Sequence, residues 1–205
     1  LSTDDPSVYR YDQMDTNSSE NSSMYMGTNS TAYYFSVASS SIANFFDEMY
    51  LNTPWEQHYN NLDGRTILDR LASVKYFVVK KGKESDLPYG YSRLSGEAEK
   101  NGKTYLAYAD EDALPLGYTY DSWISREDYD KMTVTEKQQA LLQGVVLDDS
   151  SLPETETHFN DREVSYYTSE GKGCRLKNGK VVVTQENAQL KLVFEGEENA
   201  ETYLI

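Results

Sequence analysis

The stretch from Gly64 to Val79 changes its hydrophobic period in the middle, and this change constrains the fold more than any other feature of the sequence. Apolar residues first recur at helical spacing, at Ile67, Leu68, Leu71 and Ala72. They are followed by an unbroken apolar run of aromatic and β-branched residues from Tyr76 to Val79. The pattern predicts a helix that leads directly into a buried strand. No residue in it is typical of a nucleophile, a general base or a metal ligand.

The flanking segments predict more elements of both kinds. Alternation from Val8 to Met14 indicates a short strand, and β-like patterns between Tyr89 and Ile124 are expected to extend the same sheet. Apolar residues from Ile42 to Tyr50 recur at amphipathic-helix spacing, and two helical pieces are expected from Ser125 through Val146. The sequence therefore predicts an α+β fold, with a mixed sheet and covering helices.

A polar segment from Asp148 to Asp161 separates this pattern from a different one. It carries Pro153 and several acidic residues, as domain boundaries often do. After it, helical periodicity gives way to short strand-like runs separated by turn signals. We predict an α+β domain over residues 1–150 and the start of a β-rich, sandwich-like module over residues 151–205. Its strand-like final run suggests a piece of a longer protein.

The charge balance and the single cysteine exclude several classes of function. Asp and Glu total 34 against 19 Lys and Arg, and the formal charge of −15 makes binding to nucleic acid unfavourable. Cys174 stands alone, so neither an intrachain disulfide nor a thiolate metal cage can form. No apolar run in this sequence is long enough for a membrane helix, and no stretch has the charged and apolar pattern of a signal peptide.

Residue patterns alone predict no catalytic centre. Asp110 and Asp112 have the D-x-D spacing with which metal-dependent glycosyltransferases hold a divalent ion, but a solvated loop is the favoured interpretation in so acidic a chain. His58 and His158 lie outside any metal-binding spacing. We therefore predict no catalytic residue, metal site or cofactor in this chain.

Four pieces, in the same order over about residues 8–147, carry a resemblance to a known family. They are Tyr9–Asp12, Asn21–Gly27 with Tyr33–Ser41, Leu71–Val78, and Ala113–Tyr118. The third piece, in which a helix is followed by Val74-Lys75-Tyr76 and an apolar strand, is the most specific. Together they resemble the extracytoplasmic region of the bacterial YfhO-like membrane proteins.

The resemblance implies a parent protein with many membrane helices, anchored in the plasma membrane and carrying this region on its extracytoplasmic face. Such proteins resemble glycosyltransferases that take sugars from polyprenyl-phosphate carriers and glycosylate cell-envelope polymers such as lipoteichoic acid. The expected catalytic acid would lie on an outward membrane loop outside this chain. The region itself would be an acceptor-binding or structural domain. The main alternative is a non-enzymatic cell-surface module that binds glycans or protein, and an unrecognised soluble hydrolase ranks third.

Within the resembling pieces, four polar residues are candidates for facing a ligand: Arg10, Asp12, Asn29 and Tyr33. Arg10 could pair with a phosphate, and Asp12 could accept hydrogen bonds from sugar hydroxyls. The alternative is that these residues only hold the end of the first strand, as polar pairs commonly do.

Overall fold

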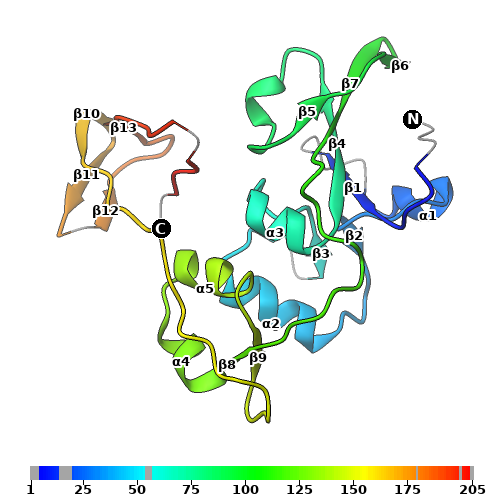
Figure 1. The fold of residues 1–205 in the computed structure, drawn as a ribbon. Helices are drawn as coiled ribbons and strands as arrows, with labels where there is room; N and C mark the ends of the chain where they lie inside the picture. The colour runs from blue at the N-terminus through cyan, green and yellow to red at the C-terminus, as the bar shows by residue number, and fades with distance from the viewer. Residues whose placement is uncertain (1–4, 14–19, 54–56, 179, 199, 204–205) are drawn as a thin grey trace. The chain divides into compact units, whose positions relative to one another are not determined.

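The computed structural model describes residues 5–13, 20–53, 57–178, 180–198 and 200–203. The chain separates into two compact units, Leu1–Phe159 and Asn160–Ile205, which are described separately (Figure 1). Whether residues 1–150 and 151–205 fold as independent domains stays a prediction.

A mixed sheet forms the first part of the first unit. Its strands are β1 (Arg10–Gln13), β4 (Val74–Lys80), β5 (Ser92–Arg93), β6 (Ala98–Lys100) and β7 (Lys103–Ala109). The order is β1-β4-β7-β5, and β6 also pairs with β7. β4 pairs parallel with β1 on one side and antiparallel with β7 on the other. A short 3-10 helix, η1 (Glu84–Asp86), follows β4.

The predicted change from helix to strand is confirmed. Helix α3 (Thr66–Leu71) ends two residues before β4, and the junction passes through Ser73 in the left-handed region, with φ 60°. The tight junction folds α3 back beside the sheet (Figure 1). The apolar run of β4 then places Val74, Phe77 and Val79 in a buried cluster with Tyr91.

The rest of the first unit consists of short elements around a second core cluster. They are α1 (Ser22–Met26), β2 (Tyr33–Tyr34), α2 (Ser40–Glu48), β3 (His58–Tyr59), β8 (Trp123–Ser125), α4 (Arg126–Lys131), α5 (Val134–Ala140) and β9 (Val145–Leu147). Met49, Leu68 and Tyr129 are fully buried in this cluster. Two helices are present in the stretch where two helical pieces are expected. The first is capped by Ser125, which accepts a bond from the Asp128 amide, and the second by Thr133, which forms a capping box with Glu136.

Three details of the predicted pattern are wrong. The last part of the β-like stretch does not join the main sheet, because β8 pairs parallel with β9 in a separate two-stranded sheet. Val145 and Val146, expected to continue a helix, form β9, since α5 ends at Ala140. The amphipathic stripe of α2 is buried only in part: Phe46 and Met49 are in the core, whereas Tyr50 is exposed.

The second unit contains β-strands and no helix among its described residues. β10 (Tyr166–Lys172) pairs antiparallel with β13 (Gln189–Phe194), and β11 (Cys174–Lys177) pairs antiparallel with β12 (Lys180–Val183). Helices and a mixed sheet in the first unit, with strands in the second, confirm the α+β class and the β-rich C-terminal part.

Candidate functional site

Asp12, one of the four candidate residues, is fully buried on β1 and bound by the segment before β2. Its carboxylate accepts bonds from Ser30 Oγ at 2.9 Å, from the Thr31 amide at 3.1 Å and from Thr31 Oγ1. Burial raises the pKa of Asp12 to about 6, although these bonds and the charge of Arg10 oppose the rise. The carboxyl group therefore changes charge in weakly acidic solution.

The other three candidates make contacts that tie neighbouring segments together. Arg10 donates from Nη1 to the carbonyl of Ala72, just after α3, at 2.6 Å. Asn29 donates from Nδ2 to the carbonyl of Tyr9 at 3.3 Å, and its own carbonyl accepts from the Tyr11 amide at 3.0 Å. The structure thus places Asn29 beside β1, next to the turn that holds Asp12.

Tyr33 lies on β2, opposite Tyr59 on the neighbouring strand β3. Its ring stacks on Tyr59, with centroids 4.9 Å apart and an interplanar angle of 22°. Burial raises the pKa of Tyr33. The contacts of all four candidates agree with a role in holding β1 and β2, and a role in facing a ligand stays a prediction.

A layer of buried carboxylates extends the site beyond the four candidates. Asp12 on β1, Asp69 on α3 and Asp110 after β7 are all at most 1% exposed. Desolvation, followed by the charges of Asp69, Asp110 and Asp12, raises the pKa of Tyr91. The Tyr91 hydroxyl donates to the carbonyl of Val74 at 2.6 Å. The charges of three buried carboxylates, one each from β1, α3 and the end of β7, thus act on one buried phenol.

Arg70 supplies the positive charge on one side of this layer. Its Nε lies 2.6 Å from Asp110 Oδ2, and its Nη2 lies 3.2 Å from Asp110 Oδ1 and 2.9 Å from Asp112 Oδ2. Glycine is favoured at position 90 for two reasons. A Cβ atom there would lie 2.9 Å from Arg70 Nη2, and the φ angle of +89° strains any residue that has a side chain. The two acids of the D-x-D spacing bind a guanidinium.

Metal binding finds no support in this arrangement. Among the residues that the structure describes, no group of three or more His, Cys, Asp or Glu side chains is arranged to hold a metal ion. Sequence reasoning missed Asp69, Arg70 and Tyr91, because they lie within or beside the apolar patterns used to assign the secondary structure. A charged pair inside an amphipathic helix, as at Asp69-Arg70, is the one signal that could have drawn attention to them.

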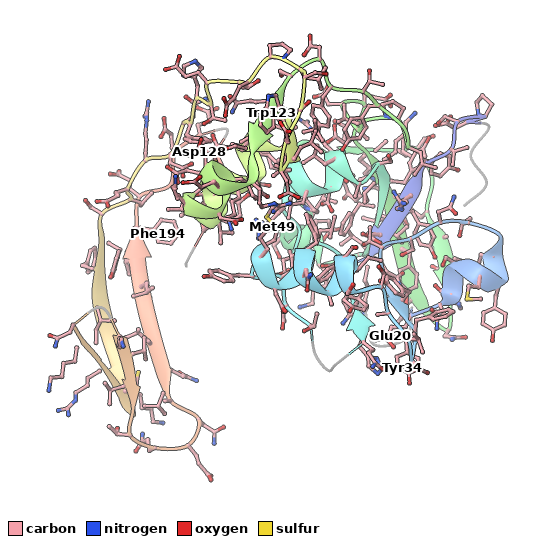
Figure 2. All side chains as sticks on the ribbon, turned by 90° about the horizontal axis from the view of Figure 1, so that it is seen from below. Glu20, Tyr34, Met49, Trp123, Asp128 and Phe194 are labelled. Carbon is pink, nitrogen blue, oxygen red and sulfur yellow. The ribbon has the colours of Figure 1, made fainter. Side chains whose placement is uncertain are left out.

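A second constellation lies at the surface, on the β2–β3 pair. The Tyr34 ring stacks on His58 with centroids 4.4 Å apart, and His58 Nδ1 lies 2.9 Å from the Glu20 carboxylate. Asn21 holds the Tyr34 backbone by bonds to both its carbonyl and its amide, at 3.0 and 3.1 Å. Glu20 and Tyr34 project from the same region of the molecule in Figure 2. An exposed ring beside a carboxylate is a combination that suits sugar binding.

Comparisons with known proteins place the chain in a family. The family model described as bacterial membrane protein YfhO matches residues 1–205. The uncharacterized protein YfhO of Bacillus subtilis (strain 168) is 26% identical over 187 residues, which are 90% of this chain and 21% of that protein. The chain thus spans about a fifth of the length of the curated relative that it matches.

No solved structure matches the chain significantly. Across the residues that the structure describes, no helix has both the length and the apolar character needed to cross a bilayer. The family match covers every residue of the sequence, and the chain therefore belongs to the YfhO family of bacterial membrane proteins.

Proposed function

We propose that this chain is the extracytoplasmic region of a multi-pass membrane protein that glycosylates a cell-envelope polymer such as lipoteichoic acid. The parent protein would take its sugar from a polyprenyl-phosphate carrier. This region would serve as an acceptor-binding or structural domain. Membership of a bacterial membrane protein family supports the membrane part of the proposal, and the resemblance to lipid-linked-sugar glycosyltransferases motivates the rest.

The observation that carries the binding role is the surface constellation of Tyr34, His58 and Glu20. Its parts are positioned before any ligand arrives, because Asn21 fixes the backbone of Tyr34 and Glu20 fixes the ring of His58. Preorganised aromatic and carboxylate groups lose little conformational entropy when they bind. A sugar ring could stack on Tyr34 while its hydroxyls donate to Glu20.

The proposed location is tested on the full-length protein with topology reporters fused on either side of this region. We expect both fusions to report membrane helices flanking an outward-facing domain. A single anchor, or none, would contradict the proposal and would favour the alternative of a cell-surface module that binds glycans or protein.

The proposed binding role is tested by titrating the chain with neutral oligosaccharides and following the amide signals of β2 and β3 by NMR. Replacing Tyr34 with alanine should weaken binding about fivefold, since stacking on an aromatic ring contributes about 1 kcal/mol. Tyr167→Ala, which removes an exposed ring from the second unit, is the matched control. Equal affinity of both variants would contradict a binding role for Tyr34.

A further inference from the structure

The segment of residues 21–46 differs in charge from the rest of the chain. It contains no Asp, Glu, Lys or Arg, although these residues make up 26% of the chain and give it a net charge of −15. The segment forms α1, β2 and the greater part of α2. This segment therefore lacks the charged side chains that favour contact with water elsewhere in the chain.

Apolar side chains of this segment are exposed to an unusual degree. Helix α1 has no buried residue, and Met24, Tyr25 and Met26 are 71%, 94% and 57% exposed. After β2, Phe35 and Val37 are 57% and 83% exposed. These five residues are called the uncharged apolar patch. Single exposed apolar residues are ordinary, whereas exposed apolar residues gathered in one place are typical of an interaction surface.

Hydrogen bonds, and not apolar burial, hold α1 in place. Asn21, just before the helix, bonds the carbonyl and the amide of Tyr34, so α1 begins beside β2. The Ser22 hydroxyl lies 3.2 Å from the hydroxyl of Tyr11, and Gly27 ends the helix in the left-handed region with its amide bonded to the Ser23 carbonyl. A helix of five residues is not stable by itself. The protein therefore fixes a short helix whose apolar side chains face outward.

We propose that the uncharged apolar patch docks on the interfacial region of a lipid bilayer. The chain belongs to a family of bacterial membrane proteins, so a bilayer is part of its surroundings. Tyrosine is enriched at membrane interfaces, where its ring contacts acyl chains and its hydroxyl stays hydrated. Burial of flexible methionine side chains adds a favourable hydrophobic contribution.

The absence of charge favours a bilayer over a protein partner. No ionised group of the segment would have to be desolvated, and no carboxylate of the segment would be repelled by anionic headgroups. Protein interfaces use charged groups around an apolar centre for steering and specificity, and this segment supplies none. The proposal rests on membership of a membrane protein family and holds whether or not the parent transfers sugar.

The experiment is co-flotation of the chain with vesicles of phosphatidylcholine and with vesicles of phosphatidylglycerol. We expect binding to phosphatidylcholine and weaker binding to phosphatidylglycerol, since the net charge of −15 opposes approach to an anionic surface. Added salt should reduce the difference by screening. Serine at all three of Met24, Tyr25 and Met26 should lower vesicle binding about tenfold or more.

The matched control places serine at three exposed apolar residues of the second unit, namely Tyr167, Val181 and Val183. This variant should bind vesicles as the unaltered chain does. Circular dichroism verifies that both variants keep the fold, which is expected because α1 contributes nothing to the buried core. The proposal would be overturned if both variants lost vesicle binding equally, or if the unaltered chain bound neither kind of vesicle.

A second measurement does not depend on removing the patch. In a Cys174→Ser background, a fluorophore attached at Tyr25→Cys should be quenched by spin-labelled lipid, whereas one attached at Val181→Cys should not. Equal quenching at both positions contradicts docking through the patch. Self-association without vesicles that depends on Met24, Tyr25 and Met26 would instead identify a second copy of the chain as the occupant. Loss of sugar binding leaves each of these results unchanged, so the two proposals fail separately.

Discussion

The two units of the chain are built from similar strands but are stabilised differently. In the first unit, Phe77 on β4 and Met49 after α2 are completely buried, each in its own apolar cluster. In the second unit, the strands pair in antiparallel ladders, with a register shift between Thr168 and Glu170, yet no residue whose burial the structure describes is buried. Paired strands without a covered face are marginally stable in water. Hydrogen-bond ladders therefore define the shape of the second unit, whereas side-chain burial stabilises the first.

The largest expected effect is the loss of core packing in the first unit. Phe77→Ala should lower the free energy of unfolding by about 3–5 kcal/mol, because the side chain is fully buried and its ring meets Tyr91 edge to face. Both tryptophans belong to the first unit, so tryptophan fluorescence in a urea titration measures the change. An effect below about 1 kcal/mol would contradict the contrast between the units.

The next effect is a pH dependence that Asp12 gives to the first unit. Its pKa is raised from 3.8 to about 6, so between these pH values the folded chain keeps a proton that the unfolded chain releases. Stability from this group is thus greatest below pH 4 and falls by about 3 kcal/mol as pH rises through about 6. Urea titrations at several pH values should show this fall in the unaltered chain and a smaller one in Asp12→Asn. The same fall in both proteins would exclude Asp12 as its source.

A smaller effect is expected from the ion pair beside the carboxylate layer. Arg70→Met leaves the buried Asp110 without its charged partner, which should cost about 2 kcal/mol, less than for a fully buried pair because Arg70 is 28% exposed. Arg93→Met is the matched control, since it breaks an exposed pair with Glu97. Thermal unfolding should separate the two variants clearly, and equal shifts would show that burial of Asp110 is unimportant.

The smallest effect is expected in the second unit. Leu192→Ala on β13 should reduce amide protection of β10 and β13 by no more than about 1 kcal/mol, because the side chain is only half-buried. Hydrogen exchange measures this locally, and the first unit should not respond. A loss as large as that from Phe77→Ala would reveal a true core in the second unit.

The features of the fold that depend on residues close together in the sequence could be predicted from it. The change of period before β4 placed α3 and the strand, and the Thr133 to Glu136 spacing gave the capping box. Asn101 and Gly102, both with positive φ, form the turn between β6 and β7 that their sequence indicates. In each case, the local preference and the tertiary structure agree.

The failures concern pairing between distant segments. Nothing near Trp123 reveals that β8 pairs with β9 instead of the main sheet, and Val145 fits a helix by periodicity until its partner strand is known. The layer of buried carboxylates could not be predicted for the same reason, since only the fold buries Asp12, Asp69 and Asp110. The sequence shows that the four candidate residues are polar. It does not show that Ser30 and Thr31 would donate hydrogen bonds to the Asp12 carboxylate.

The parallel pairing of β1 with β4 also predicts an order of folding. Arg10 lies opposite Val74, so the strand synthesised first cannot find its partner until the chain has been made past α3. The antiparallel partners β4 and β7 are closer in sequence and have less loop entropy to overcome. β1 is therefore expected to join the sheet late, and the carbonyl of Asn29 then bonds the amide of Tyr11 on the outer edge of that strand. That bond occupies a backbone donor that an edge strand would otherwise offer to another chain.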